Sequence, residues 1–172
     1  MILSPGLRRL VLTAHVASSV GWLGAAVAFL ALTVAGLTGQ DAQMLRAVYL
    51  AAEPITLFVI VPFAIASLIT GVVASLGTSW GLFRHYWVVF KLVLTVLATI
   101  VLLQYIETVR HFADTAAGAG PVDVSGLRSY LLHAGGGLLV LLVTVVLAVY
   151  KPRGLTPYGW RRQQEQGRVS QP

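Results

Sequence analysis

The sequence contains no cysteine among its 172 residues, and charged residues make up only 10% of it. The absence of cysteine excludes disulfides, thiolate metal sites, iron–sulfur clusters and thiol nucleophiles. The scarcity of charge excludes an ordinary soluble domain, in which about 25% of residues are charged. Hydrophobic residues account for 57% of the chain and the mean hydropathy is +0.82, which also excludes intrinsic disorder. This composition is typical of a small polytopic membrane protein.

Four long apolar stretches follow one another with short polar links. They predict membrane-spanning helices over about residues 10–37, 47–76, 86–112 and 127–150, because about 20 apolar residues cross a bilayer as a helix. Short links favour antiparallel neighbours. We therefore predict an all-α fold, an integral membrane four-helix up-down-up-down bundle over residues 1–150. The basic tail, residues 151–172, is polar and is expected to be weakly ordered.

Most of the 12 lysines and arginines are predicted to lie at one end of this bundle. These are Arg8, Arg9, Arg84, Lys91, Lys151, Arg153, Arg161, Arg162 and Arg168, whereas Arg46, Arg110 and Arg128 lie at the other end. The positive-inside rule then predicts a multi-pass protein of the cell membrane with both termini in the cytoplasm. The basic tail is expected to contact the anionic leaflet of the lipid bilayer. No folded motif surrounds its bases, so a nucleic-acid partner is not expected.

Two ionisable residues are expected in the cytoplasmic third of the spans, His15 and Lys91. Ser18, Ser19 and Trp22 follow His15 at i+3, i+4 and i+7, so they extend its helix face as a polar seam, which predicts that His15 faces the bundle interior. One interpretation is a hydrogen-bonded neutral imidazole and a lysine that reaches the headgroups. The other interpretation is a shared binding site.

The outer half holds Glu53, the only acid well inside a span, and Pro54 follows it. Proline loosens the preceding turn, which often accompanies a cavity in membrane helices. The alternative is an interhelical bond from Glu53 to Arg46, Arg128 or His133. His133 begins the run His133-Ala134-Gly135-Gly136-Gly137, where the glycines allow close approach by another helix or by a flat macrocycle.

The four histidines allow two kinds of metal site to be compared. Zinc or copper needs several ligands that converge at one depth, but no HxxxH or HxxE spacing is present and the histidines divide between the two membrane faces. A haem needs only one or two axial ligands in an apolar slot. The sequence therefore favours haem b over zinc or copper, with His15 as the first choice of axial ligand.

Three segments resemble a known superfamily of small membrane proteins. They are His15-Val-Ala-Ser-Ser-Val-Gly-Trp22-Leu-Gly24, Tyr86-Trp87-Val-Val-Phe-Lys91-Leu92 and Met44-Leu45-Arg46-Ala-Val-Tyr49. The chain resembles uncharacterised small integral membrane proteins related to the bacterial copper-resistance protein D family and the haem-containing protoporphyrinogen oxidases. The resemblance implies a four-helix membrane fold. It also implies that His15 and Lys91 carry haem binding or catalysis.

Three classes of function follow from these residues. The first is a haem- or porphyrin-binding redox protein in which His15, Lys91, Trp22 and His133 contact the cofactor. The second is a non-enzymatic scaffold or regulatory subunit that binds a membrane partner or a second copy of itself. The third is a component of a proton- or metal-coupled transporter, with Glu53, Glu107 and His133 as an outer entry and His15 and Lys91 as an inner exit. Whether the chain is an enzyme is left open by the residues themselves.

Overall fold

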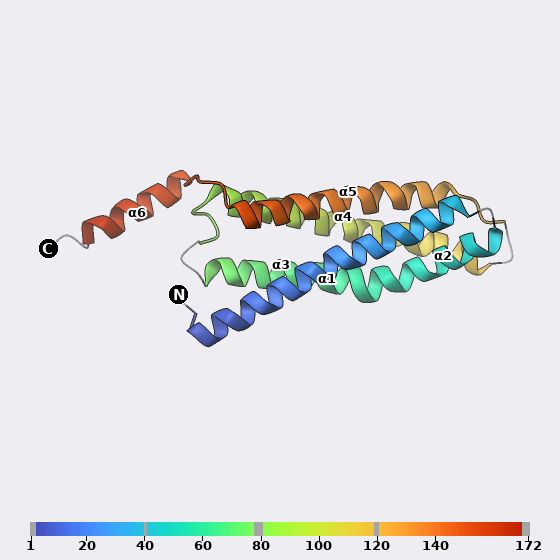
Figure 1. Ribbon diagram of the computed structural model, residues 1–172, viewed down its shortest axis with the longest axis horizontal. Helices are drawn as coiled ribbons and strands as arrows, with labels where there is room; N and C mark the ends of the chain where they lie inside the picture. Colours follow the sequence, from blue (N-terminus) through green and yellow to red (C-terminus); the bar gives the residue numbers. More distant parts are fainter. Residues whose placement is uncertain (1–2, 40, 78–80, 119–120, 170–172) are drawn as a thin grey trace.

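The computed structural model of the protein describes residues 3–39, 41–77, 81–118 and 121–169. Every secondary-structure element in these ranges is a helix (Figure 1). The elements are α1 (Pro5–Thr38), α2 (Ala42–Ile55), the π-helical turn η1 (Thr56–Ile60), α3 (Val61–Leu76), α4 (Tyr86–Ala117), α5 (Ser125–Tyr150) and α6 (Pro157–Val169). Helices α2, η1 and α3 form one continuous span. With α1, α4 and α5 this gives four helices long and apolar enough to cross a membrane, so the predicted all-α bundle is confirmed.

The four spans run up and down in chain order (Figure 1). Helix α1 packs against α3 and α5, and α4 packs against α2, α3 and α5. The two termini and the α3–α4 link lie at one end, whereas the α1–α2 and α4–α5 links lie at the other end. We name the half with the termini the inner half and the opposite half the outer half. The cyclic order of neighbours places α1 and α4 across the bundle from each other.

Side-chain caps determine where two of the spanning helices begin. Ser4 accepts a hydrogen bond from the Leu7 amide at 3.4 Å, and Pro5 occupies the first turn, where its missing N–H costs nothing. Helix α1 therefore starts at Pro5, earlier than the predicted residue 10. Asp41 accepts a bond from the Gln43 amide at 3.0 Å and starts α2. Before α5, Asp123 accepts a hydrogen bond from the Ser125 amide at 2.9 Å, in a turn around the N-cap residue Val124, which has no side-chain cap.

The second span contains a wide turn between two prolines, Pro54 and Pro62. Neither residue has an N–H for the helical ladder, so hydrogen bonding is disturbed on both sides. Between them the amide of Val61 donates to the carbonyl of Thr56, five residues back, which is the π-helical pattern of η1. The Thr56 hydroxyl adds a bond of 2.8 Å to the carbonyl of Ala52. The sequence predicts a loosened turn before Pro54, whereas the π-helical turn follows it, between the two prolines.

Packing is much denser in the outer half than in the inner half. The largest fully buried side chains all belong to the outer half: Tyr49, Tyr130, Leu127, Val48, Val109 and Thr33. The ring of Tyr130 lies 5.3 to 6.1 Å from the rings of Phe29, Tyr49, Tyr105 and Phe112. Towards the inner end α1 diverges from α5 (Figure 1). The aromatic cluster around Tyr130 therefore forms the centre of the core.

The tail is more ordered than the sequence predicts, because residues 157–169 form helix α6. The Thr156 hydroxyl accepts a bond from the Gly159 amide at 3.1 Å, and Pro157 occupies the first helical position. Half of the residues that follow, 158–169, are arginine or glutamine, which are good helix formers. The polar composition that suggested weak order therefore belongs to a helix outside the four spans.

Candidate functional site

His15 lies in the inner half of α1, and its ring is held against α3. Its Nδ1 atom lies 3.1 Å from the carbonyl oxygen of Ser67 and 3.3 Å from the hydroxyl of Thr70. Because a carbonyl oxygen only accepts hydrogen bonds, a neutral ring making this bond carries its proton on Nδ1. The lone pair is then on Nε2. The local geometry therefore selects the ring nitrogen that can ligate a metal or accept a proton.

The polar seam of α1 meets a matching polar stripe on α3. The hydroxyls of Ser19 and Ser67 lie 2.7 Å apart, and the Ser18 hydroxyl donates to the carbonyl of His15 at 3.1 Å. Gly71 completes the contact, because a Cβ atom there would lie 2.9 Å from Cε1 of His15. Trp22, one turn deeper, is 5% exposed and belongs to the core. The seam thus joins α1 to α3.

The stripe on α3 went unnoticed in the sequence. Ser67, Thr70 and Gly71 have the spacing i, i+3 and i+4, which places them on one helix face. A search of the second span for small and polar residues at this spacing would have found the face that receives His15. The charged residues Glu53 and Lys91 indicate a site more strongly than this stripe does, because charge in a membrane helix is the costlier feature.

Lys91 lies on α4, across the bundle from His15 on α1. Its side chain is half-buried. Within the described part of the chain, the ion pairs involve Arg110 and Arg162, and no carboxylate lies within 4.0 Å of the Lys91 ammonium. The inner half therefore holds an imidazole on α1 and an ammonium group on the opposite helix, α4. Such a pair suits a ligand that carries a negative charge.

His133 lies in the outer half of α5 and does not join this group. Its ring is exposed and stacks on Tyr105, with ring centroids 3.6 Å apart and planes 15° from parallel. Its Nδ1 lies 3.0 Å from the carbonyl oxygen of Ser129, whose hydroxyl accepts a 2.6 Å bond from Tyr105. His15 and His133 therefore occupy opposite halves of the bundle, and one iron cannot take both as ligands.

The glycines that follow His133 form an open helix surface. A Cβ atom at Gly135, Gly136 or Gly137 would meet nothing within 4 Å outside its own helix. The sequence interpretation of these glycines as a close helix–helix contact is therefore wrong within a single copy of the chain.

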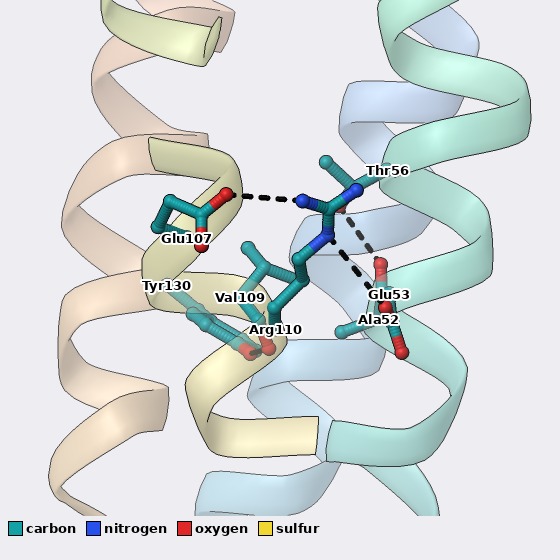
Figure 2. Close-up of polar contacts among 7 residues, drawn as sticks. All are labelled: Ala52, Glu53, Thr56, Glu107, Val109, Arg110 and Tyr130. Atoms are coloured by element: carbon teal, nitrogen blue, oxygen red, sulfur yellow. Dashed lines mark hydrogen bonds and ion pairs between the residues drawn. The ribbon is translucent and has the colours of Figure 1, made fainter. Parts of the chain in front are cut away.

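Glu53 forms an ion pair with Arg110 of α4, across the outer half (Figure 2). The carboxylate oxygen of Glu53 lies 4.0 Å from Nε of Arg110, and Glu107 lies 3.0 Å from the same guanidinium group. The three partners that the sequence suggested for Glu53, namely Arg46, Arg128 and His133, are wrong. Arg46 instead donates to the carbonyls of Ala116 and Gly118 near the end of α4.

Metal-ligating residues do not gather in the described ranges. No group of three or more histidine, aspartate or glutamate side chains is placed to hold a metal ion there. The candidate site of the bundle consists of the polar residues described above in the inner half: His15, Ser19, Ser67, Thr70 and Lys91. We call it the His15 site.

No family model, curated protein or solved structure matches this chain. The structure by itself identifies a small polytopic membrane protein built as a four-helix bundle.

Proposed function

We propose that this membrane protein binds haem or a related porphyrin in the inner half of the bundle, with His15 as the axial ligand. The observation that carries the proposal is the bond between Nδ1 of His15 and the Ser67 carbonyl, which leaves the Nε2 lone pair for a ligand. Metal-bound histidines usually donate their other N–H to such an acceptor, which fixes the ring and raises its basicity. The sequence resemblance around His15 and Lys91 supports the same assignment.

The donors of the His15 site fit a porphyrin in their chemistry. His15 offers one imidazole nitrogen, and a haem needs one or two axial ligands. Lys91 offers an ammonium group to a propionate. A bound haem would supply an iron that accepts and returns one electron. The chain's own contribution is to fix the ring of His15 through Ser67 and Thr70 and to neutralise a carboxylate through Lys91.

The proposal includes an orientation in a bacterial cell membrane, with both termini and the His15 site on the cytoplasmic side. It rests on the basic residues at the inner end. Because the chain has no cysteine, single cysteines report this cleanly. Tyr158→Cys should resist an impermeant maleimide in intact cells, and Pro121→Cys should react. The reverse labelling pattern would overturn the orientation.

The experiment that tests the proposed function is an absorption spectrum, taken on protein from haem-replete cells and during titration with hemin. We expect a Soret band that saturates at one haem per chain. His15→Ala should abolish or shift this band, because the axial nitrogen is lost. Lys91→Ala should keep the band and weaken hemin binding several-fold, because only a charge partner is lost.

Two histidine variants serve as matched controls. His133→Ala and His111→Ala remove exposed imidazoles of the outer half, so both should keep the wild-type spectrum. A protein that stays colourless throughout the titration would refute the proposal. A Soret band that depends on His133 and not on His15 would move the cofactor to the outer half and refute the assignment of the site.

A further inference from the structure

A second polar site lies outside the spans, at the inner end of the bundle. A cavity of about 840 Å³ opens between the start of α4 and the chain that leads from α5 into α6. Its lining includes the basic residues Arg84, Lys151 and Arg153, together with His85 and the aromatic rings of Trp87 and Trp160. We call it the basic pocket. The haem proposal uses none of these residues.

Backbone hydrogen bonds hold the two walls of the basic pocket together. The Thr156 amide donates to the carbonyl of Arg84 at 3.0 Å, and the Tyr86 amide donates to the carbonyl of Gly154 at 3.3 Å. His85 and Leu155 form an antiparallel bridge between these bonds. The pocket is therefore built from two distant segments in a fixed register, and differs from a basic tail that only lies near a membrane.

The first turn of α6 is seated against the same loop. The Thr156 hydroxyl donates to the carbonyl of Phe83 at 2.5 Å. Gly159 packs directly on the carbonyl of Arg84, where any Cβ atom would clash. This contact carries Trp160 and Gln163 into the wall of the pocket. Helix α6 then continues beyond the end of the bundle (Figure 1).

The chemistry of the basic pocket suits a phosphate group. Three of its lining side chains carry permanent positive charge, and the described residues that line it include no aspartate or glutamate. Arginine binds phosphate oxygens through a planar fork of N–H donors, and lysine adds a compact charge. Tryptophan rings are enriched at the level of lipid headgroups, where one face meets acyl chains.

The position of the basic pocket identifies the source of the phosphate. Helix α4 begins at Tyr86 and α5 ends at Tyr150, so the residues that line the pocket adjoin the ends of two spans. Headgroup phosphates lie at this depth of a bilayer. We propose that the basic pocket binds the headgroup phosphate of one anionic phospholipid, while Trp87 and Trp160 flank the headgroup.

The test is titration of delipidated full-length protein in neutral detergent with short-chain phosphatidylglycerol, followed by native mass spectrometry. We expect one saturable equivalent of phosphatidylglycerol and no comparable binding of phosphatidylcholine. The variant Lys151→Asn/Arg153→Gln should weaken binding of phosphatidylglycerol about 30-fold, at roughly fivefold for each base near the headgroup. Asparagine is chosen because position 151 has a φ of 44°, which asparagine tolerates.

The matched control is Arg161→Gln/Arg162→Gln, which removes the same charge from exposed positions of α6 outside the pocket. It should change the affinity less than twofold. Equal weakening by both double variants would overturn the proposal, because it would show diffuse attraction to the tail. The single variant Arg153→Gln alters one exposed side chain and should still weaken binding about fivefold if the double variant misfolds.

A soluble competitor distinguishes a pocket that binds a phospholipid from one that binds a phosphate group without acyl chains. Glycerophosphoglycerol carries the same phosphodiester group without acyl chains, so it should displace phosphatidylglycerol only at concentrations at least 100-fold higher. Displacement at equal concentration would overturn the lipid assignment.

Discussion

The outer and inner halves of this bundle are built from the same helices but differ in how completely their side chains are buried. In the outer half, the aromatic cluster around Tyr130 is closed and its polar groups are satisfied: the Tyr49 hydroxyl donates to the Asp123 carbonyl at 2.8 Å and accepts from the Leu127 amide at 3.0 Å. In the inner half, the side chains of His15 and Lys91 are only half-buried, and α1 diverges from α5. Stability is therefore expected to depend mainly on the outer half, and ligand binding on the inner half.

The difference has a physical reason. Lipid tails are as apolar as leucine, so helices in a bilayer associate through close packing and interhelical hydrogen bonds. The outer half has both kinds of contact around Tyr49 and Tyr130. In the inner half, the Ser19–Ser67 bond and the hydrogen bonds of the His15 ring, which also lies against Gly71, join α1 to α3. A region with fewer fully buried large side chains can open for a ligand at lower cost in free energy.

The largest expected effect on stability is that of Tyr130→Ala. The change removes a ring that contacts four other aromatic rings and a hydroxyl that donates to the Val109 carbonyl at 3.3 Å. We expect a loss of about 3 to 5 kcal/mol, as for large-to-small changes in a packed core. The measurement is the free energy of unfolding in mixed micelles.

Tyr150→Ala is the control for Tyr130→Ala. Tyr150 is 77% exposed at the inner end of α5, so its loss should cost less than about 0.5 kcal/mol. Equal destabilisation by the two variants would contradict the contrast between the halves.

The next effect is that of Gly126→Ala at the start of α5. A Cβ atom there would lie 2.7 Å from the ring of Phe112 and 2.7 Å from the hydroxyl of Tyr49. Overpacking of this kind costs about 1 to 3 kcal/mol. Thermal unfolding in detergent would measure it. Gly136→Ala is the matched control on the same helix: its Cβ meets nothing within 4 Å, so we expect no loss or a gain of up to about 1 kcal/mol.

The sequence predicts the fold far better than the site, and particular residues show why. Apolar length alone predicts the four spans, because it is set by the thickness of the bilayer. Caps such as Ser4 extend the helices by a turn, and Thr156 starts α6, which composition alone did not reveal. The predicted partners of Glu53 were wrong because the sequence does not distinguish among the three arginines at the outer end of the bundle. Only helix rotation selects Arg110.

The sequence predicts the part of the His15 site that lies on α1, but not the part that lies on α3. Helical spacing places Ser19 on the face of His15, since both positions lie on one helix. Their acceptors on α3, Ser67 and Thr70, depend on how two helices are rotated about each other. The basic pocket depends on a bridge between His85 and Leu155, which are far apart in the chain. Nothing in the local pattern of either segment indicates that pairing.

Ser67→Ala is expected to have a smaller effect, in the inner half. It removes the hydroxyl that pairs with Ser19 and keeps the carbonyl that holds His15. Interhelical hydrogen bonds in membranes contribute about 0.6 kcal/mol on average, and that is the loss we expect in unfolding titrations. Ser75→Ala should cost less, because the Ser75 hydroxyl donates only within α3, to the Gly71 carbonyl at 2.8 Å. A loss above about 2 kcal/mol in Ser67→Ala would show that the inner half is not loosely held.

The smallest effect concerns pH at the outer end, where Asp123 precedes α5. Hydrogen bonds from the hydroxyl and the backbone amide of Ser125, 2.5 and 2.9 Å long, hold the pKa of this exposed carboxyl below its ordinary value of 3.8. A depressed pKa in the folded state gives stability that is fully present above about pH 4 and is lost as the pH falls through the folded value. Asp123→Asn should therefore lower Tm slightly at pH 5 and flatten its fall below about pH 4. Ser125→Ala keeps the carboxyl and removes one donor, so it should move the fall in Tm towards pH 3.8. An unchanged profile in both variants would show that the Asp123–Ser125 hydrogen bonds contribute nothing to the stability of the outer half.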